Sequence, residues 1–550
     1  MRRRAAGTER RGATLLDIDW RFLLPPTLDG SFRRLLLLGA DESVAEQARA
    51  AGVARGVVLQ PTAETADAVV CLRGAGATLE EVATHVARDG VLYYETGRGL
   101  GWPFGASADR LRRSARRAGL AKTRLYWVHP QFQEARTYFP LDVPRAVEWH
   151  LGSLQIAATL PARIVRRLLR ALARRPALLA RLVPRVALVA VRGGAHEPGV
   201  PSQLPEPLRG RGRTSLVLVH GDERSRVVAL PFAADSEVPL AVVKFFRRPR
   251  AGGAAEGEQR VLQQIRPNLH PRLRATVPEP LGVVQTTHNA AAVESFLPGE
   301  WLHARWASSR QRFGQLLEDL ELVVDWLIDF HLATRQEARS WDDRDADACL
   351  GQLADYERAF GTTGAESHLF TVARRHARAA IGTSLPIVWQ HSDLSSLNMF
   401  RDGSSVRVID WEGATVGPPL DDLLYFATRW LERARRAPRA DIDVAFRELF
   451  LGPPTGDRAV AAVRSAITRY ADALELDDRL FPLLVLQPWL RRAVGRLGRN
   501  VTPRLSAREP AIGGGMNHQR VGNRYVTYVE VLAESPETLF ALPTAGWREP

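Results

Sequence analysis

Two apolar runs near residue 400, each leading to an acidic residue, constrain the fold of this chain more than any other stretch. The first run, from Ile387, leads into the polar turn that holds His391, Asp393 and Asn398. The second run, 406–409, ends on Asp410. Two apolar runs separated by a polar turn predict a strand, a loop and a strand. The sequence therefore predicts two strands whose ends carry carboxylates.

These polar residues suit the transfer of a phosphoryl group to an alcohol. That reaction needs a carboxylate that orients the hydroxyl and accepts its proton, and it needs Mg²⁺ held by hard oxygen ligands. Asp393 could face the hydroxyl, Asn398 could offer a neutral carbonyl oxygen to the metal, and Asp410 could bridge to it. A polar hairpin with solvated acids is the alternative interpretation. Three ordered motifs within one short stretch argue against it.

The order of the motifs resembles a known family. Protein kinases carry His-Arg-Asp-x4-Asn, but here Ser392 replaces the arginine and Asp410-Trp-Glu replaces Asp-Phe-Gly. The stretch from His391 to Leu423 is similar to the aminoglycoside phosphotransferase and choline kinase family. The usual forms there are His-Gly-Asp-x4-Asn, Ile-Asp-Trp-Glu and Gly-x-Pro-x-x-Asp-Leu. The best resemblance spans about 205–430.

The resemblance implies an α+β bilobal protein-kinase-like fold and a role for each matching residue. Asp393 would be catalytic, Asn398 and Asp410 would bind Mg²⁺, and His391 and Asp422 would support the catalytic loop. ATP or GTP would be the phosphoryl donor.

A lysine near residue 244 is informative because only two lysines, Lys122 and Lys244, stand among the 75 Lys and Arg residues. Because the chain otherwise uses arginine, a lysine indicates a position that needs a compact ammonium. Lys244 ends the third of three predicted strands, 215–219, 226–232 and 239–246. The family resemblance places it on the nucleotide phosphates, although a surface lysine at a strand end is the alternative.

The same resemblance assigns further nucleotide-binding residues. Glu258 would pair with Lys244, with Glu256 as a competitor close in sequence. The segment with Glu294 and Phe296 resembles the hinge, where backbone groups of an extended segment meet adenine. An apolar strand that ends in a Pro-Gly turn is the alternative for this segment, and both interpretations can hold.

Residues 1–195 alternate apolar runs with helix-like segments, which predicts an α/β domain with a mostly parallel sheet. We expect strands at 32–39, 66–72, 91–95 and 185–191, and helices after Asp41 and Thr78. The order resembles a class I methyltransferase. Its cofactor turn, Gly39–Ser43, has only one glycine, so binding of S-adenosylmethionine is doubtful. The expected domains are therefore a methyltransferase-like domain 1–195, a linker 196–204, a kinase-like N-lobe 205–297 and a C-lobe 298–550 with acceptor-binding helices.

The net charge of +14 raises the question of an anionic partner. Because no nucleic-acid-binding motif accompanies the arginines, we prefer a solvated arginine-rich surface and expect no nucleic acid. Residues 161–175 form a basic amphipathic pattern that suits either a peripheral membrane contact or packing on the protein itself, and we favour packing. We expect a cytoplasmic protein, because no apolar run reaches membrane-spanning length and Cys71 and Cys349 form no disulfide or metal pattern.

The sequence thus predicts an ATP- or GTP-dependent phosphotransferase that acts on a small-molecule hydroxyl. Arginines outnumber acidic residues in 425–550, so we expect a neutral or anionic acceptor such as a sugar or polyol, and an aminoglycoside is less expected. Two alternatives stay open. One is a catalytically silent kinase-like module that binds nucleotide, and the other is an S-adenosylmethionine-dependent methyltransferase.

Overall fold

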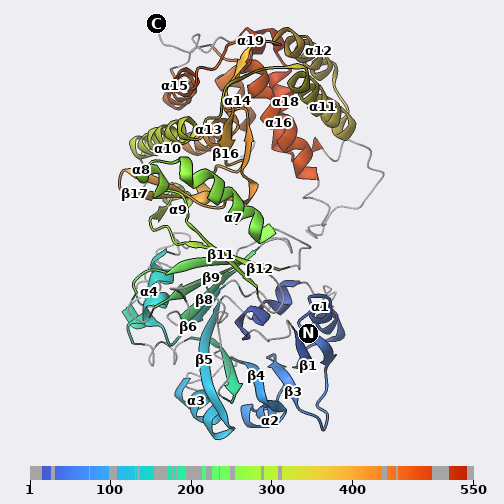
Figure 1. Cartoon of the computed structure of the whole chain (residues 1–550), viewed down its shortest axis with the longest axis vertical. Coiled ribbons are helices and arrows are strands. Elements are labelled where there is room, and N and C mark those ends of the chain that lie inside the picture. The colour runs from blue at the N-terminus through green and yellow to red at the C-terminus, as the bar shows by residue number, and fades with distance from the viewer. Residues whose placement is uncertain are drawn as a thin grey trace, which may run out of the picture. The chain divides into compact units, whose positions relative to one another are not determined.

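The chain forms two compact units in a computed structural model. Unit 1 comprises 1–263 and 278–298, and unit 2 comprises 264–277 and 299–550. Figure 1 shows most of the strands in unit 1 and most of the helices in unit 2. The structure describes residues 15–25, 31–73, 75–97, 108–129, 132, 135, 137–153, 168, 171–175, 179, 183–193, 208, 213–218, 226–233, 236–247, 254–285, 290–307, 312–436, 442–453, 456–497 and 520–541.

Unit 1 is organised around a 12-stranded sheet of order β11-β12-β10-β9-β8-β6-β5-β7-β4-β3-β1-β2. The strands are β1 Phe32–Leu38, β2 Ala54–Val58, β3 Ala66–Cys71, β4 Val86–Gly97, β5 Leu120–His129, β6 Thr137–Pro140, β7 Arg185–Arg192, β8 Arg213–Leu218, β9 Arg226–Phe232, β10 Ala241–Phe246, β11 Pro280–Gln285 and β12 Ala290–Ser295. The helices are η1 Leu15–Leu23, α1 Glu42–Ala50, α2 Leu79–Thr84, α3 Ala108–Arg117, α4 Pro144–Ser153 and α7 Ala254–Ile265, whose last residues belong to unit 2.

The first strands and helices form where the sequence pattern predicts them. In β1, Leu35 and Leu37 enter one core while Leu36 and Leu38 enter another, because successive side chains of a strand point to opposite faces of the sheet. The expected capping box at Thr78 begins α2, with Thr78 and Glu81 each accepting a hydrogen bond from the backbone N–H of the other. Local sequence therefore decides these elements.

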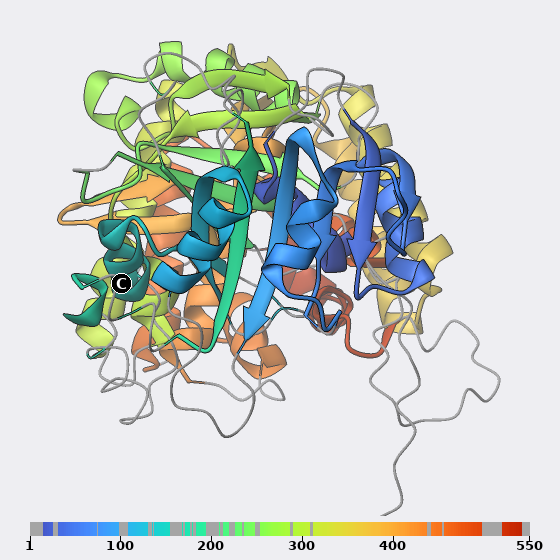
Figure 2. The ribbon, with the colours of Figure 1, turned by 90° about the horizontal axis from the view of Figure 1, so that it is seen from below.

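The expected mostly parallel sheet of residues 1–195 is in fact mixed. Strands β2, β1, β3 and β4 pair in parallel, but β7 pairs antiparallel with both β4 and β5. In Figure 2 the blue strands lie side by side, with the teal strand β7 beside them. The all-apolar pattern of β7 fits its central position, because both of its faces are covered. Apolar pattern alone does not give strand direction, so sequence could not exclude this arrangement.

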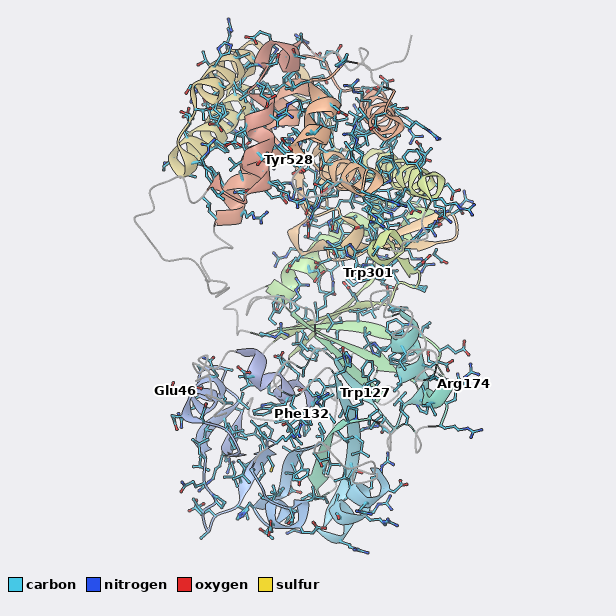
Figure 3. All side chains as sticks on the ribbon, turned by 180° about the vertical axis from the view of Figure 1, so that it is seen from behind. Glu46, Trp127, Phe132, Arg174, Trp301 and Tyr528 are labelled. Atoms are coloured by element: carbon cyan, nitrogen blue, oxygen red, sulfur yellow. The ribbon has the colours of Figure 1, made fainter. Side chains whose placement is uncertain are left out.

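The sheet continues past the segment expected to be a linker. Strand β6 pairs antiparallel with β8, and β8 pairs with β9, so strands on both sides of 196–204 belong to one sheet. Residues 196–204 themselves lie outside the described residues, and the boundaries at 195 and 205 stay predictions. Most of the basic segment 161–175 also lies outside them. Arg174 is described, is exposed on one side of unit 1 in Figure 3, and pairs with Glu148 at 2.9 Å.

Unit 2 is mostly helical. Its helices are α8 Pro271–Arg274, α9 Leu302–Ala307, α10 Phe313–Ala333, α11 Asp343–Phe360, α12 Gly364–Ala379, α13 Asp421–Ala434, α14 Ile442–Phe450, α15 Arg458–Ala473, α16 Phe481–Leu497, α18 Arg524–Leu532 and α19 Pro536–Phe540, with short turns η3 Arg266–Asn268, η4 Ser396–Asn398 and η5 Trp411–Gly413. Its strands are β13 Glu300–Trp301, β14 Arg339–Ser340, β15 Ser384–Leu385, β16 Val388–Gln390, β17 Met399–Asp402, β18 Ser405–Val408 and β19 Thr415–Gly417.

Within the described residues, none of the helices has both the length and the apolar composition needed to cross a bilayer. Cys71 and Cys349 are free and buried.

A buried carboxyl on β4 makes the stability of unit 1 depend on pH. Glu95 Oε2 accepts from Arg73 N–H at 2.9 Å, Oε1 accepts from the Tyr93 hydroxyl at 3.1 Å, and burial raises the pKa of Glu95 to about 7. Because this pKa exceeds that of an unfolded chain, the proton is bound more tightly in the folded protein. The resulting stabilisation is complete below about pH 4.5 and is lost as the pH rises through about 7.

We predict that the Glu95→Gln variant lacks this pH dependence. Between pH 5 and pH 8, deprotonation of Glu95 should lower the free energy of unfolding of the wild type by on the order of 2 kcal/mol. The free energy of unfolding of the variant should depend less on pH. Urea unfolding at several pH values measures both. Glu46→Gln, at the exposed Glu46 of α1 labelled in Figure 3, is the control and should follow the wild type. Equal slopes in wild type and Glu95→Gln would contradict this account.

Candidate active site

A buried carboxylate, Asp422, holds the loop that follows β16. At the start of α13, its Oδ2 accepts from His391 N–H at 2.6 Å and its Oδ1 accepts from Ser392 N–H at 2.8 Å. Burial opposes ionisation, but the neighbouring His331 and His391 rings and these backbone donors hold the pKa of Asp422 below its usual value. His331 Nε2 lies 3.8 Å from Asp422 Oδ2. Asp422 therefore stays charged and fixes two consecutive peptide groups.

His391 ties the same loop to the next strand. Its Nε2 lies 2.8 Å from the Ile409 carbonyl oxygen, which can only accept, so Nε2 carries the proton. Its Nδ1 then accepts from Asp393 N–H at 3.3 Å. The ring also meets the buried Trp411 edge-on, with centroids 4.8 Å apart. His391 thereby connects the segment before Asp393 with the segment before Asp410.

The structure brings Asp393, Asn398 and Asp410 together. Asn398 Nδ2 donates to Asp393 Oδ2 at 3.2 Å and to the Asp393 carbonyl oxygen at 3.0 Å. Because the amide nitrogen is used in this way, the amide oxygen is the atom of Asn398 that suits a cation. Loss of hydration raises the pKa of Asp393, and the nearby Asp410 carboxylate raises it further, whereas His391 and Arg492 oppose the rise. The three side chains thus share one electrostatic environment.

Two residues of this site have left-handed backbone conformations. Ser392 has φ +67° and Asp410 has φ +69°. Aspartate adopts this region more readily than most residues, whereas a serine here stands where the related family has glycine. Two hydrogen bonds hold the strained conformation of Ser392. Its N–H donates to Asp422, and its carbonyl oxygen accepts from Arg492.

Arg492 is a site residue to which the sequence interpretation gave no role. It extends from α16 and donates to the Ser392 carbonyl oxygen at 3.0 Å and to Asp421 Oδ1 at 2.8 Å. Its guanidinium also lies 3.8 Å from the centre of the Tyr425 ring. The doublet Arg491-Arg492 was visible in the sequence, but only the fold shows that α16 returns to the catalytic loop.

The nucleotide-binding candidates lie in unit 1, and three of them form one buried cluster. Lys244 Nζ lies 2.7 Å from Glu258 Oε1 and 2.7 Å from Glu294 Oε1. Arg226, which the sequence interpretation missed, pairs with Glu258 Oε2 at 2.7 Å. Although burial opposes ionisation of Glu258, the two cations hold its pKa well below its usual range. Glu256 does not displace Glu258 from this pair.

Phe296, the fourth candidate, does not join the cluster. Its ring packs edge-on against Trp149 of α4, with centroids 5.5 Å apart.

The donors present fit a magnesium ion that is completed by other ligands. Among the described residues, no group of three or more His, Cys, Asp and Glu could hold a metal by itself. Mg²⁺ is commonly bound by one or two carboxylates together with substrate phosphates and water, so Asp410 and the Asn398 amide oxygen match its usual demand.

Residues 232–461 match the phosphotransferase enzyme family. This match confirms the resemblance to the aminoglycoside phosphotransferase and choline kinase family that the motifs between His391 and Leu423 indicated. The C-terminal part of the chain accordingly has the kinase-like fold of that family, and the mixed sheet of the N-terminal part precedes it. A methyltransferase-like character of the N-terminal part is not confirmed.

Several solved structures are similar to the chain at low identity. A glucosamine kinase bound to glucosamine, ADP and phosphate is 21% identical, covering 52% of this chain and 76% of its own at a TM-score of 0.31. A choline kinase from Cryptosporidium parvum is 10% identical, covering 62% and 95% at a TM-score of 0.35. A macrolide 2'-phosphotransferase from Brachybacterium faecium is 18% identical, covering 55% and 93% at a TM-score of 0.29. TM-scores this low add nothing to the family match. No curated protein matches the chain.

We predict that Ser392 tolerates glycine but not a β-branched residue. Ser392→Val should lower the free energy of unfolding by about 1–2 kcal/mol, because a branched side chain is strained at positive φ. Ser392→Gly should stay within about 0.5 kcal/mol of wild type, because relief of strain offsets the added freedom of the unfolded chain. Urea unfolding measures both. Ser405→Val, at the exposed first residue of strand β18, is the control that should not destabilise. Equal losses at 392 and 405 would contradict the strain argument.

Proposed function

We propose that the chain is a small-molecule kinase that transfers the γ-phosphoryl group of ATP or GTP to an acceptor hydroxyl. The observation that carries the proposal is the shared geometry of Asp393, Asn398 and Asp410 on a loop fixed by Asp422. Positioning and electrostatics supply most of the catalysis in phosphoryl transfer. Three oxygen-bearing side chains held in a fixed arrangement are therefore the groups that the reaction needs.

Asp393 is the proposed base. Its Oδ2 is held by Asn398, so the other carboxylate oxygen can accept a hydrogen bond from the acceptor hydroxyl and take its proton as the phosphorus–oxygen bond forms. Its raised pKa makes it a better proton acceptor than an ordinary aspartate. Asn398 and Asp410 would hold Mg²⁺. The bound ion would neutralise charge on the transferring phosphates.

Lys244 is the proposed phosphate contact, and Glu258 is the residue that orients it. The pair is buried, and the attraction between the ammonium and the carboxylate is stronger there than at an exposed site. We propose that the segment with Glu294 and Phe296 meets the nucleotide base. In the structure Lys244 is engaged by two carboxylates, and this observation favours the alternative of a catalytically silent nucleotide-binding module. Activity measurements decide between the two.

For the acceptor we propose a neutral or anionic hydroxyl compound such as a sugar or polyol. A cavity of about 120 Å³ in unit 2 is lined by Trp341, Gln352, Gln487, Arg491 and Asp421, among others. Asp421 is bonded to Arg492, which in turn bonds the catalytic loop. The amides, the guanidinium and the indole ring of this lining suit a hydroxylated ligand, and the carboxylates of Asp421 and Asp345 can accept hydrogen bonds from its hydroxyl groups.

For residues 1–195 we propose a methyltransferase-like fold that has lost its cofactor site. Helix α1 covers one face of the parallel strands and α2 covers the other, which supports the fold. The turn after β1 has a single glycine, Gly39, whose φ of +78° and close approach to the Leu72 carbonyl serve the turn itself. We further propose that the enzyme works in the cytoplasm, because two free buried cysteines suit a reducing compartment.

A screen of acceptors tests the proposed function directly. Sugars, polyols and aminoglycosides are offered with Mg²⁺ and ATP or GTP, and formation of the nucleoside diphosphate and of a phosphorylated product is measured. We expect transfer to at least one sugar or polyol and none by Asp393→Asn. Nucleotide binding without transfer to any acceptor would instead support the alternative, a catalytically silent nucleotide-binding module.

We predict that the two acids separate chemistry from metal binding. Asp393→Asn should bind Mg²⁺-nucleotide normally but lose transfer at least about 100-fold, because the amide keeps the shape and cannot accept the proton. Asp410→Asn should weaken Mg²⁺-dependent nucleotide binding about tenfold or more, with partial recovery at high Mg²⁺, because a hard cation loses an anionic ligand. Calorimetry and initial rates measure these effects.

The control for both acids is Asp402→Asn, which removes an exposed carboxylate from the turn between β17 and β18. It should change neither binding nor transfer. Equal binding losses in the Asp393 and Asp410 variants would show that the roles are assigned wrongly.

We predict that Lys244→Arg lowers nucleotide affinity or turnover about tenfold or more. A planar guanidinium keeps the charge but does not fit a buried site built around a compact ammonium that touches both Glu258 and Glu294. Lys122→Arg, at the only other lysine of the chain, is the matched control and should behave as wild type. Unchanged kinetics in Lys244→Arg would remove this residue from the site.

A further inference from the structure

The sheet face that carries Lys244 can be followed across β9 and β10. Lys244 lies opposite Val228, and because side chains alternate, the Val242 side chain shares this face with them. Leu230 and Phe232 follow Val228 at intervals of two and lie on the same face. Under the proposed function this face is the one that meets the nucleotide, since Lys244 contacts the phosphates and the hinge segment meets the base.

Helix α4 covers that face beyond Lys244. One apolar cluster joins Ala146 and Trp149 of the helix, and Val143 just before it, to Leu230 and Phe232. Val228 and Val242 also belong to this cluster. Leu230 is 6% exposed and Phe232 is fully buried, so solvent does not reach this part of the face. Figure 1 shows α4 beside β8 and β9. A surface expected to receive a nucleotide is therefore already occupied by the chain itself.

Trp149 connects the helix to the predicted hinge. Its ring lies edge-on to Phe296, with centroids 5.5 Å apart, and edge-on to Phe232, with centroids 5.7 Å apart. An indole is a flat bicyclic aromatic group of about the size of a purine. The next residue, His150, is also buried beside Phe232, and burial lowers its pKa to about 3, so its ring is neutral and suited to a dry site.

The opposite side of α4 is anchored elsewhere. Val147 and Leu151 enter the core that contains α2 and α3, so α4 joins the N-terminal part of unit 1 to the strands β9 and β10. Lys244 is meanwhile paired with Glu258 and Glu294. The position of α4 and the pairing of Lys244 thus both leave the proposed nucleotide surface covered.

We propose that α4 is an internal competitor of the nucleotide: Trp149 occupies the surface on which the base would lie, and nucleotide binds only when α4 leaves it. The inference rests on the proposed function, because that function assigns this face to the nucleotide. Apparent affinity is the intrinsic affinity reduced by the fraction of molecules with α4 displaced. Weakening the contact of Trp149 therefore raises that fraction and tightens binding.

Calorimetry of Mg²⁺-ATP and Mg²⁺-GTP with the full chain tests the competition. Trp149→Ala should bind at least one of them tenfold tighter or more than wild type, whereas Trp149→Phe, which keeps an aromatic ring, should stay within about threefold. The matched control is Trp20→Leu, because Trp20 is a buried tryptophan that packs on Tyr93 in the core on the other face of the sheet, away from α4. It should leave nucleotide affinity unchanged.

The outcomes separate this proposal from the proposed function. Measurable binding of equal strength in wild type and Trp149→Ala would overturn the competition and leave the kinase proposal standing. Absence of binding in both folded proteins would overturn the two together. If Trp149→Ala fails to fold, hydrogen exchange of the wild type decides: the α4 amides must lose protection on addition of saturating Mg²⁺-nucleotide, and unchanged protection would overturn the competition.

Discussion

The loop that carries the proposed base Asp393 depends on one buried carboxylate. Asp422 is fully buried and accepts hydrogen bonds from two consecutive backbone N–H groups, those of His391 and Ser392. Hydrogen bonds to a charged acceptor contribute about 1.5–3 kcal/mol each, enough to hold Ser392 at a positive φ that serine otherwise avoids. The direction in which Asp393 leaves the loop follows from that turn. A fully buried carboxylate outside the proposed catalytic set thereby decides where the proposed base stands.

Short-range patterns made most of this loop predictable. The spacing of His391, Asp393 and Asn398 and the later Asp422 were sufficient to expect one constellation, and the structure brings these residues together. Arg492 could not be expected in the same way. It contacts Ser392 across 100 residues of sequence, and the contact exists only because α16 packs back against α13. A doublet of arginines in a chain rich in arginine carries no sign of such a partner.

The sheet shows the same division between local and distant information. Periodicity and caps located β1, β3, β9 and β10 within one or two residues. The order of the strands could not be predicted in this way, because the pairing of β6 with β8 and the insertion of β7 between β4 and β5 depend on contacts between residues far apart in the sequence. Glycine and proline in 193–203 indicate a break in regular structure, but a break in one segment does not require a break in the sheet.

The pairing of Lys244 shows how composition and burial combine. A buried ammonium requires compensation, and here two carboxylates on different elements supply it, while Arg226 pairs with the second oxygen of Glu258 so that two cations face two carboxylates. Such a cluster is stable without a nucleotide, whereas a lone lysine facing an empty cleft would favour deprotonation. Under the proposed function, phosphate would compete with Glu294 for the lysine, and the nucleotide base would compete with Trp149 for the sheet. Both competitions would take place within unit 1, on the face of β10 that carries Lys244 and Val242.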